Sequence, residues 1–411
     1  MSTPALGDTL HLWFLADPDR PVPVGELGLV MGRRGVSLRY GQRWLEEGFA
    51  LSEDLPLTDL EHFPRDKDTA AGAVDDARPD RWGERVIRLL DRPPRLSLLE
   101  YLYFAGDDRF GALGVSTEAD RYRPHVVGPL PTLSDVDAVH AVVLRVLAGE
   151  PVEERQKRLI APGVTMGGAR PKALLRVDGV PWVLKFAEAD RPDEPLVEHA
   201  TLTLAAQAGI TVARTFPVPL ARGVAVAVRR FDRAGGGRVH ALSANVALKA
   251  AGVDLSYPEL ALLLRRRGDT GTHRAQMREL FRRLVFNILV DNTDDHEKNH
   301  VLLVGPDRFY RLAPAFDVVP MGTSLGCQAL DVGERGAEST IDNALTAASH
   351  YWLTRQAAVD EARRVSLVVD RWRAHFAGQG LSAATIDELA RHIDRPFLRE
   401  QRSALRGSGG A

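Results

Sequence analysis

The sequence predicts an α+β protein with a strand-rich first half and a helical C-terminal part. Short segments of alternating apolar and polar residues fill positions 10–40, and further strand-like segments lie between 172 and 228. From residue 256 onward the apolar residues recur with the three- and four-residue spacing of helices.

The composition is that of a soluble globular protein of two or three domains. The chain has 411 residues, more than one ordinary core accommodates, with 45% hydrophobic and 26% charged residues. A formal net charge of −2 argues against a global basic field for nucleic acid. The single cysteine, Cys327, excludes an internal disulfide and a cysteine-based zinc site.

The chain carries no recognisable membrane or secretion signal. The segment Met1–Asp8 lacks the basic and apolar regions of a signal peptide. No apolar run approaches the roughly 20 residues needed to span a bilayer. We therefore expect a cytoplasmic protein without membrane contact. The glycine-rich residues 406–411 are expected to be a disordered tail.

The first 150 residues are predicted to form a small antiparallel sheet followed by helices. Proline near the first turn of Pro79–Ile87 indicates a helix start, and valines at helical spacing predict a helix over about 134–148. Trp82 is expected in the core and Arg81 at the surface. The predicted strands span residues 10–15, 22–30 and 36–40, with a glycine-containing turn at 32–35.

A glycine-containing loop, Gly163–Pro171, precedes a predicted hairpin of two strands, Lys172–Val177 and Trp182–Phe186, joined by a two-residue turn. Lys185 lies within the second strand among apolar neighbours, where its charge needs a counter-ion. It is either an edge-strand lysine that prevents aggregation or a lysine directed at phosphates bound under the loop. Glu198, on a helix predicted from about 192 to 209, could pair with it.

After residue 210 the chain changes from strands to helices. A glycine linker over 235–237 is expected to be flexible and to mark a hinge between two lobes. Ser256 and Glu259 form a capping-box pattern before a helix that stops at Gly268. The predicted strands are 216–218 and 224–228, and further helices are predicted over about 273–290 and 357–376 and from near 382.

The polar segment Asn292–His300 lies between an apolar helix and an apolar strand, Val301–Val304. Asp294 and Asn299 are five residues apart, the spacing of the aspartate and asparagine in a protein-kinase catalytic loop. Asp317 follows after one predicted hairpin, where kinases carry a second magnesium-binding aspartate. Taken alone, the segment is equally well explained as a solvated, capped loop.

These features occur together in the order that phosphoryl transfer requires. The glycine loop and Lys185 would hold phosphates, Asn299 and Asp317 would bind Mg²⁺, and Asp294 would orient the attacking hydroxyl. Two alternatives stay open. His296 and His300, with Asp294 or Asp295, could bind a metal in a hydrolase, or the chain could be a catalytically inactive nucleotide-binding scaffold.

The motifs resemble those of HipA-type serine/threonine kinases, the toxins of bacterial toxin–antitoxin pairs, over nearly the whole chain. The matching residues are Gly167-Gly168-Ala169-Arg170-Pro171-Lys172, Trp182–Phe186, Arg230–Arg233, Thr293–Asn299, Pro314–Asp317, and, in the N-terminal part, Pro79–Gly83 and Gly111–Leu113.

The resemblance implies a two-lobed protein-kinase-like fold with an additional N-terminal β-rich subdomain and a helical C-terminal lobe. The implied parts are residues 1–125, 126–233 and 234–405. ATP and Mg²⁺ are the implied cofactors. Nucleotide contacts are expected from the loop residues Gly167–Lys172, from Lys185, from the Arg229–Arg230–Phe231 backbone as the adenine hinge, and from His296 and Lys298.

The resemblance also implies partners. The family binds a small helix-turn-helix antitoxin of the HipB type, so contact with DNA is expected only through that antitoxin. Known members phosphorylate translation factors such as aminoacyl-tRNA synthetases. The serine that the family phosphorylates in its own phosphate loop corresponds here to Thr165, which is therefore a candidate for autophosphorylation.

Overall fold

The computed structural model describes residues 6–126, 128–160, 168, 170–188, 190–321 and 326–407. Two compact units divide the chain. Unit 1 comprises residues 1–186, 220–222 and 229–251, and unit 2 comprises 187–219, 223–228 and 252–411. Each unit is described by itself below. The three-part division inferred from the sequence stays a prediction. Of the expected tail over 406–411, Arg406 and Gly407 end α13, and residues 408–411 lie outside the described residues.

Unit 1 contains a six-stranded sheet whose main order is β4-β3-β2-β1-β6, with β5 paired to β3. The pairs along the main order are antiparallel, and β3–β5 is parallel. The inward residues of the central strands, such as Leu12, Leu27 and Leu38, are fully buried, as the alternating pattern predicts. The strands are β1 Thr9–Phe14, β2 Val22–Val30, β3 Gly35–Tyr40, β4 Glu61–His62, β5 Thr69–Ala70 and β6 Leu113–Ser116.

The helices of unit 1 begin at polar caps. Ser97 and Glu100 form a reciprocal capping box at the start of α3, and the Asp80 side chain accepts the Gly83 N–H at the start of α2. Trp82 lies in the core, as predicted from the sequence. The helices are α1 Gln42–Glu47, α2 Arg81–Leu90, α3 Leu98–Phe104, α4 Val136–Ala148 and α6 Ala244–Ala251.

Two hairpins of unit 1 contain or adjoin residues that the sequence predicts to bind nucleotide. β7 (Lys172–Val177) and β8 (Val180–Lys185) pair antiparallel through the predicted turn, where Asp178 and Gly179 both have positive φ. The glycine stretch predicted as a flexible linker is instead the tight turn of a second hairpin, β11 (Arg233–Ala234) with β12 (Gly237–Arg238). Gly235 and Gly236 have φ of 56° and 81°, which is the backbone that such a two-residue turn requires. β13 (His240–Ser243) follows.

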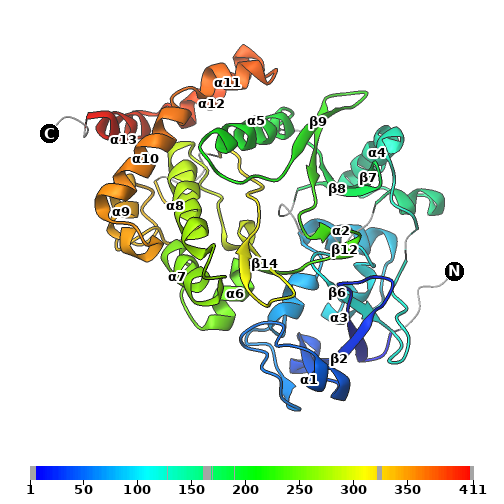
Figure 1. Cartoon of the computed structure of the whole chain (residues 1–411). Coiled ribbons are helices and arrows are strands. Elements are labelled where there is room, and N and C mark those ends of the chain that lie inside the picture. Colours follow the sequence, from blue (N-terminus) through cyan, green and yellow to red (C-terminus); the bar gives the residue numbers. More distant parts are fainter. Residues whose placement is uncertain are drawn as a thin grey trace. The chain divides into compact units, whose positions relative to one another are not determined.

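Unit 2 is mainly helical. The long helix α8 packs beside α7 and α10 (Figure 1). Leu284, Ile288 and Met277 of α8 are fully buried, as the helical periodicity predicts. The helices are α5 Glu194–Gln207, α7 Tyr257–Arg267, α8 His273–Leu289, α9 Ile341–Thr346, α10 Arg355–Val369, α11 Trp372–Gly378, α12 Ala383–Ile393 and α13 Pro396–Gly407.

Two antiparallel hairpins complete unit 2. β9 (Thr215–Pro219) pairs with β10 (Val224–Arg229), and β14 (Val301–Val304) pairs with β15 (Tyr310–Leu312). The second hairpin connects the segment that carries Asp294 to the segment that carries Asp317. The sequence prediction of strand, turn and returning strand is confirmed here.

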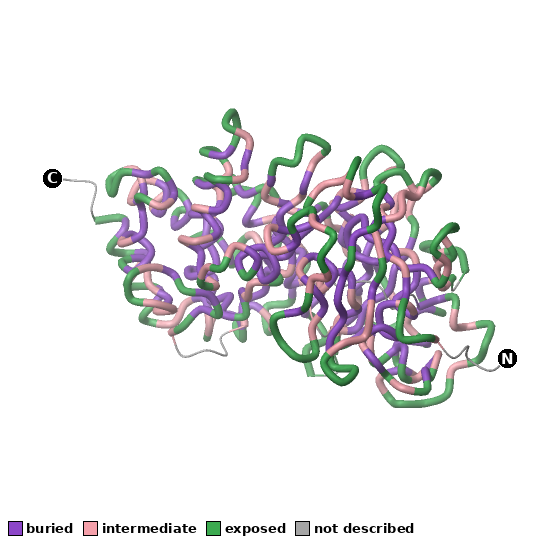
Figure 2. The backbone as a smooth tube through the Cα atoms, turned by 90° about the horizontal axis from the view of Figure 1, so that it is seen from below, coloured by how far each residue is buried: buried purple, intermediate pink, exposed green. Residues whose placement is uncertain are grey.

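The prediction of one continuous helix over residues 357–376 is wrong, because this range contains two helices, α10 and α11. The chain breaks between α10 and α11, where the Asp370 carboxylate accepts a hydrogen bond from Arg402 Nε at 3.1 Å. Figure 2 shows the C-terminal helices with buried and exposed positions alternating around each turn.

Among the described residues, no helix combines the length and apolarity needed to cross a membrane.

Candidate active site

Helix α8 delivers the chain into a short loop that carries Asp294. The Asp294 side chain is exposed, whereas its backbone carbonyl accepts bonds from His296 N at 2.9 Å and Asn299 Nδ2 at 3.2 Å. Asn299 is 6% exposed and ends a 3₁₀ turn, Glu297–Asn299. The loop is therefore held through its backbone, and the Asp294 carboxylate projects from it.

The neighbouring Asp295 is buried and serves a different purpose. Its carboxylate accepts hydrogen bonds from the Tyr257 hydroxyl, from Asn287 Nδ2 at 2.8 Å and from His300 Nε2 at 3.1–3.2 Å. Burial alone would raise the pKa of Asp295, but the charge and hydrogen bond of His300 and the bond from Tyr257 together hold it below its usual value. Burial next to this carboxylate raises the pKa of the Tyr257 hydroxyl well above its usual value.

This arrangement gives no support to the metal-hydrolase alternative. His300 is 3% exposed and packs edge-on against the Tyr257 ring at 4.9 Å, so it belongs to the buried network. The His296 ring accepts the Lys298 N–H through Nδ1 at 3.2 Å. Within the part of the chain that the structure describes, no group of three or more His, Cys, Asp or Glu side chains is placed to hold a metal ion.

Asp317 lies on the segment after the β14–β15 hairpin and has a φ of 57°, an uncommon backbone for a non-glycine residue. Its N–H donates to Glu198 Oε1 of α5 at 3.1 Å, and Glu198 is 2% exposed. Asn299 lines a small cavity together with Phe316 and Val318, the residues on either side of Asp317. Unit 2 thus brings the two predicted magnesium ligands to neighbouring segments.

The predicted pairing of Glu198 with Lys185 stays a prediction, because the two residues belong to different units. Lys185 ends β8 and is 2% exposed, and it lies directly opposite Lys172 in the β7–β8 register. The Lys172 ammonium bonds to the Asp80 carboxylate and to the Gly168 carbonyl. Of the other loop residues, Thr165, Gly167 and Ala169 lie outside the described residues.

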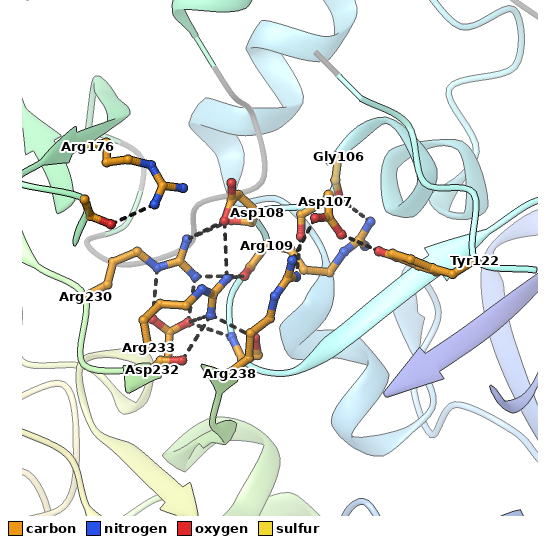
Figure 3. A network of polar contacts seen from close by, with 12 residues as sticks. Gly106, Asp107, Asp108, Arg109, Tyr122, Arg176, Arg230, Asp232, Arg233 and Arg238 are labelled. Atoms are coloured by element: carbon orange, nitrogen blue, oxygen red, sulfur yellow. Dashed lines mark hydrogen bonds and ion pairs between the residues drawn. The ribbon is translucent and has the colours of Figure 1, made fainter. Parts of the chain in front are cut away.

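The predicted adenine hinge, Arg229–Phe231, is held by a buried polar network (Figure 3). The Arg230 guanidinium donates to Asp232 Oδ1 and Oδ2 at 2.9 and 2.7 Å, and the Arg233 guanidinium donates to Oδ2 at 2.9 Å. Asp232 also accepts the Gly111 N–H at 2.8 Å. The Arg230 side chain is thus committed to the protein interior, and its backbone N–H donates to the Pro181 carbonyl at 3.3 Å. The role of this segment as an adenine hinge stays a prediction.

The same network includes the loop over residues 107–109. Arg230 and Arg233 donate to the backbone carbonyl of Arg109, each at 2.8 Å, and Arg238 pairs with the Asp107 carboxylate at 2.7 Å. Burial by itself would raise the pKa of Asp232, but the two arginines lower it far below the usual value. The sequence showed the charged residues of this segment without showing that they face inward.

A comparison with known families identifies the chain. Residues 164–377, just over half of the chain, match the family model described as “HipA-like C-terminal domain”. The chain belongs to the HipA-like family. The matched range contains Lys185, Glu198, Asp294, Asn299 and Asp317, so the resemblance drawn from the motifs is confirmed.

One curated relative of this HipA-like chain is “Putative kinase Y4dM” of Sinorhizobium fredii. It is 26% identical over 234 residues, which are 53% of this chain and 56% of that protein. The chain thus spans about half the length of the curated relative it matches.

Among solved structures, the HipA-like chain resembles HipA in a complex of the Shewanella oneidensis MR-1 toxin–antitoxin system, which contains HipA, HipB and operator DNA. The TM-score is 0.67 at 17% identity, over 97% of each chain. This likeness confirms the predicted α+β fold of the kinase-like HipA type.

Sequence reasoning missed two groups that support the site. The first is the buried set of Tyr257, Asn287, Asp295 and His300. The second is the contact of Asp80 and Trp82 with Lys172. A contact across 92 residues leaves no local pattern in the sequence.

Proposed function

We propose that this HipA-like chain is an ATP-dependent serine/threonine protein kinase. The observation that carries the proposal is the contrast within one loop between exposed Asp294 and buried Asp295. A carboxylate that must accept a hydroxyl proton has to be accessible, and its loop has to be rigid. The hydrogen bonds to Asp295 and to the Asp294 carbonyl provide that rigidity.

The remaining parts have the roles expected of a phosphoryl-transfer site. Asp294 would accept the proton of the attacking hydroxyl. Lys185 and the glycine loop would hold the phosphates of ATP, with Glu198 as the counter-ion of Lys185, and the backbone of Arg229–Phe231 would bind adenine. His296 and Lys298 are proposed to contact the nucleotide.

Asn299 and Asp317 would hold Mg²⁺. Both offer oxygen donors, which Mg²⁺ prefers, and they lie on neighbouring segments of unit 2. The Asp317 N–H donates to Glu198 Oε1 at 3.1 Å, which ties the Asp317 segment to α5. Bound Mg²⁺ neutralises charge on the transferred phosphoryl group.

The test compares the wild type with Asp294→Asn and with Asp307→Asn, a change at an exposed aspartate on the β14–β15 turn. We expect Mg·ATP to raise the melting temperature of all three proteins. Transfer of radiolabelled phosphate to protein should fall at least about 100-fold in Asp294→Asn only. Nucleotide binding without transfer by the wild type would identify a scaffold, and near-normal transfer by Asp294→Asn would refute the role of Asp294.

The proposed partners follow from the family. The Shewanella HipA structure contains HipB and operator DNA, and we propose a HipB-like helix-turn-helix antitoxin for this chain, with DNA bound only through it. We propose that the substrate is a cytoplasmic protein of the translation machinery, such as an aminoacyl-tRNA synthetase, and that the phosphoryl group is transferred to one of its side-chain hydroxyls. Binding of operator DNA by the chain without its antitoxin would contradict this assignment.

We also propose that Thr165 is autophosphorylated and that the modification inactivates the kinase. A phosphate would add about −1.5 to −2 charge next to the site for ATP phosphates, so the two would repel each other. The measurement is phosphosite mapping after incubation with Mg·ATP, in the wild type and in Asp294→Asn. Full ATP affinity in a stoichiometrically phosphorylated sample would exclude the inactivating effect.

A further inference from the structure

The N-terminal motif Pro79–Gly83 has no role in the function proposed above and lies outside the matched HipA-like domain. The Asp80 carboxylate divides its two oxygens between two partners. Oδ1 accepts the Gly83 N–H at 2.9 Å and so caps α2, and Oδ2 bonds to the Lys172 ammonium. Trp82 Nε1 donates to the Lys172 carbonyl at 2.7 Å. One short motif therefore holds both the side chain and the main chain of Lys172.

Lys172 needs such a partner. It is 1% exposed, and an ionised ammonium is buried at high cost unless it is paired. It also lies directly opposite Lys185 on the adjacent strand, and like charges at opposed positions repel each other. Asp80 supplies the opposite charge, so that Lys172 can remain ionised beside Lys185.

Lys172 in turn holds the end of the glycine loop. Its ammonium donates to the carbonyl of Gly168, which has a φ of 63° and so requires glycine. The next strand begins at Lys172, and Phe186 N donates to the Pro171 carbonyl at 3.0 Å. A chain of contacts thus runs from Asp80 through Lys172 to Gly168.

We infer that Asp80 is a positioning residue for the phosphate loop: through Lys172 it fixes Gly168 in the conformation that binds nucleotide phosphates. The inference rests on the proposed function as an ATP-binding kinase. Lys172 then acts as an anchor of the loop, not as a direct phosphate ligand. The N-terminal part of the chain would contribute to nucleotide binding in this way, through its contacts with Lys172.

This role predicts a selective defect. Asp80→Asn keeps an oxygen for the helix cap and the shape of the side chain, and removes the charge that holds Lys172. ATP affinity should fall about tenfold or more, because the phosphate loop loses its anchor. Adenosine affinity should stay within about twofold, because adenosine carries no phosphates and its base binds at the hinge.

The experiment measures Kd of Mg·ATP and of adenosine by calorimetry for full-length wild type, Asp80→Asn, Lys172→Met and the double variant. Asp75→Asn is the matched control. Its carboxylate has the same 13% side-chain exposure as Asp80 and pairs with Arg78 at 3.2 Å. We expect the ratio of ATP to adenosine affinity to fall in Asp80→Asn and not in Asp75→Asn. The double variant should bind ATP no more weakly than Lys172→Met.

Trp82→Phe provides a second perturbation. It removes the indole N–H donor to the Lys172 carbonyl together with part of the buried ring, but it leaves the Asp80 charge in place, so it should lower the same ratio by a smaller factor. An unchanged ratio in Asp80→Asn, or a loss confined to Lys172→Met, would overturn the positioning role and identify Lys172 as a direct ligand. If the wild type binds no ATP, the kinase proposal itself fails. Intact ATP binding by the wild type with an unchanged ratio in Asp80→Asn refutes the present inference alone.

Discussion

Replacing Asp232 by asparagine should destabilise unit 1 strongly. Asp232 is fully buried and accepts three hydrogen bonds from two guanidinium groups, at 2.7–2.9 Å, and one from the Gly111 N–H. Asparagine has nearly the same shape, so no cavity forms, but its NH₂ group faces donors and its charge is zero. The substitution therefore removes the negative charge and one acceptor oxygen with little change in packing.

The expected loss in the free energy of unfolding depends on the contacts that Arg230 and Arg233 keep in the variant. Removing one partner of a buried ion pair costs about 3–5 kcal/mol. Arg230 and Arg233 keep their bonds to backbone carbonyls, and the Asp108 carboxylate lies 4.0 and 3.7 Å from them. We therefore expect the lower part of the range, about 3–4 kcal/mol. With a urea slope of about 2 kcal/mol/M, the midpoint of unfolding would fall by about 1.5–2 M.

The assay is urea denaturation followed by circular dichroism, fitted as separate transitions where the two units unfold independently. Asp307→Asn is the matched control, because Asp307 also binds one arginine through both oxygens but is 42% exposed. That exposed pair should contribute about 0–1 kcal/mol. Equal shifts for Asp232→Asn and Asp307→Asn would refute the argument that burial makes the Asp232 network important.

Three further predictions concern unit 2. Asp317→Ala should weaken binding of Mg·ATP more than binding of Mg-free ATP, and equal losses by calorimetry would count against a metal role. Tyr257→Phe should cost about 1.5–3 kcal/mol in urea unfolding because Asp295 loses a donor, whereas Tyr351→Phe should not, since the Tyr351 hydroxyl has no partner among the described residues. Burial lowers the pKa of His375, whose Nε2 lies 2.9 Å from Thr203 Oγ1 and 3.2 Å from the Ala200 carbonyl. The unfolded imidazole then binds protons more readily, so stability should decline as pH falls below about 6.5, and the melting temperature of His375→Gln should depend less on pH between 7.5 and 5.5.

The sequence predicted most elements because their signals are local. The turn at Asp178-Gly179 depends on the positive φ that glycine permits. The end of α7 at Gly268 depends instead on the missing side chain, because a Cβ there would meet the Leu264 carbonyl oxygen. Both predictions are confirmed. The break after α10 was missed because neither glycine nor proline occurs there. Asp370 ends that helix while bonding to Arg402, a residue 32 positions away.

The candidate site was predictable as a set of residue types and not as a set of contacts. The short spacing between Asp294 and Asn299 correctly predicted that they lie close together, because one loop contains both residues. Contacts across many residues, such as Glu198 with the Asp317 N–H, depend on how α5 packs. A helix glutamate in sequence shows only that a charge is present. The residue it faces is decided by packing.

Asp294 and Asp295 illustrate why adjacent residues of one type need the structure to be told apart. In the sequence the spacing to Asn299 favours Asp294 as the proton acceptor, but it does not show that Asp295 is buried. Tyr257 and Asn287 approach from α7 and α8 and satisfy Asp295. Because that carboxylate is buried and accepts hydrogen bonds from three side chains, it needs no ligand to satisfy it. The same bonds hold the loop in which Asp294 is exposed, which is the condition that its proposed role as proton acceptor requires.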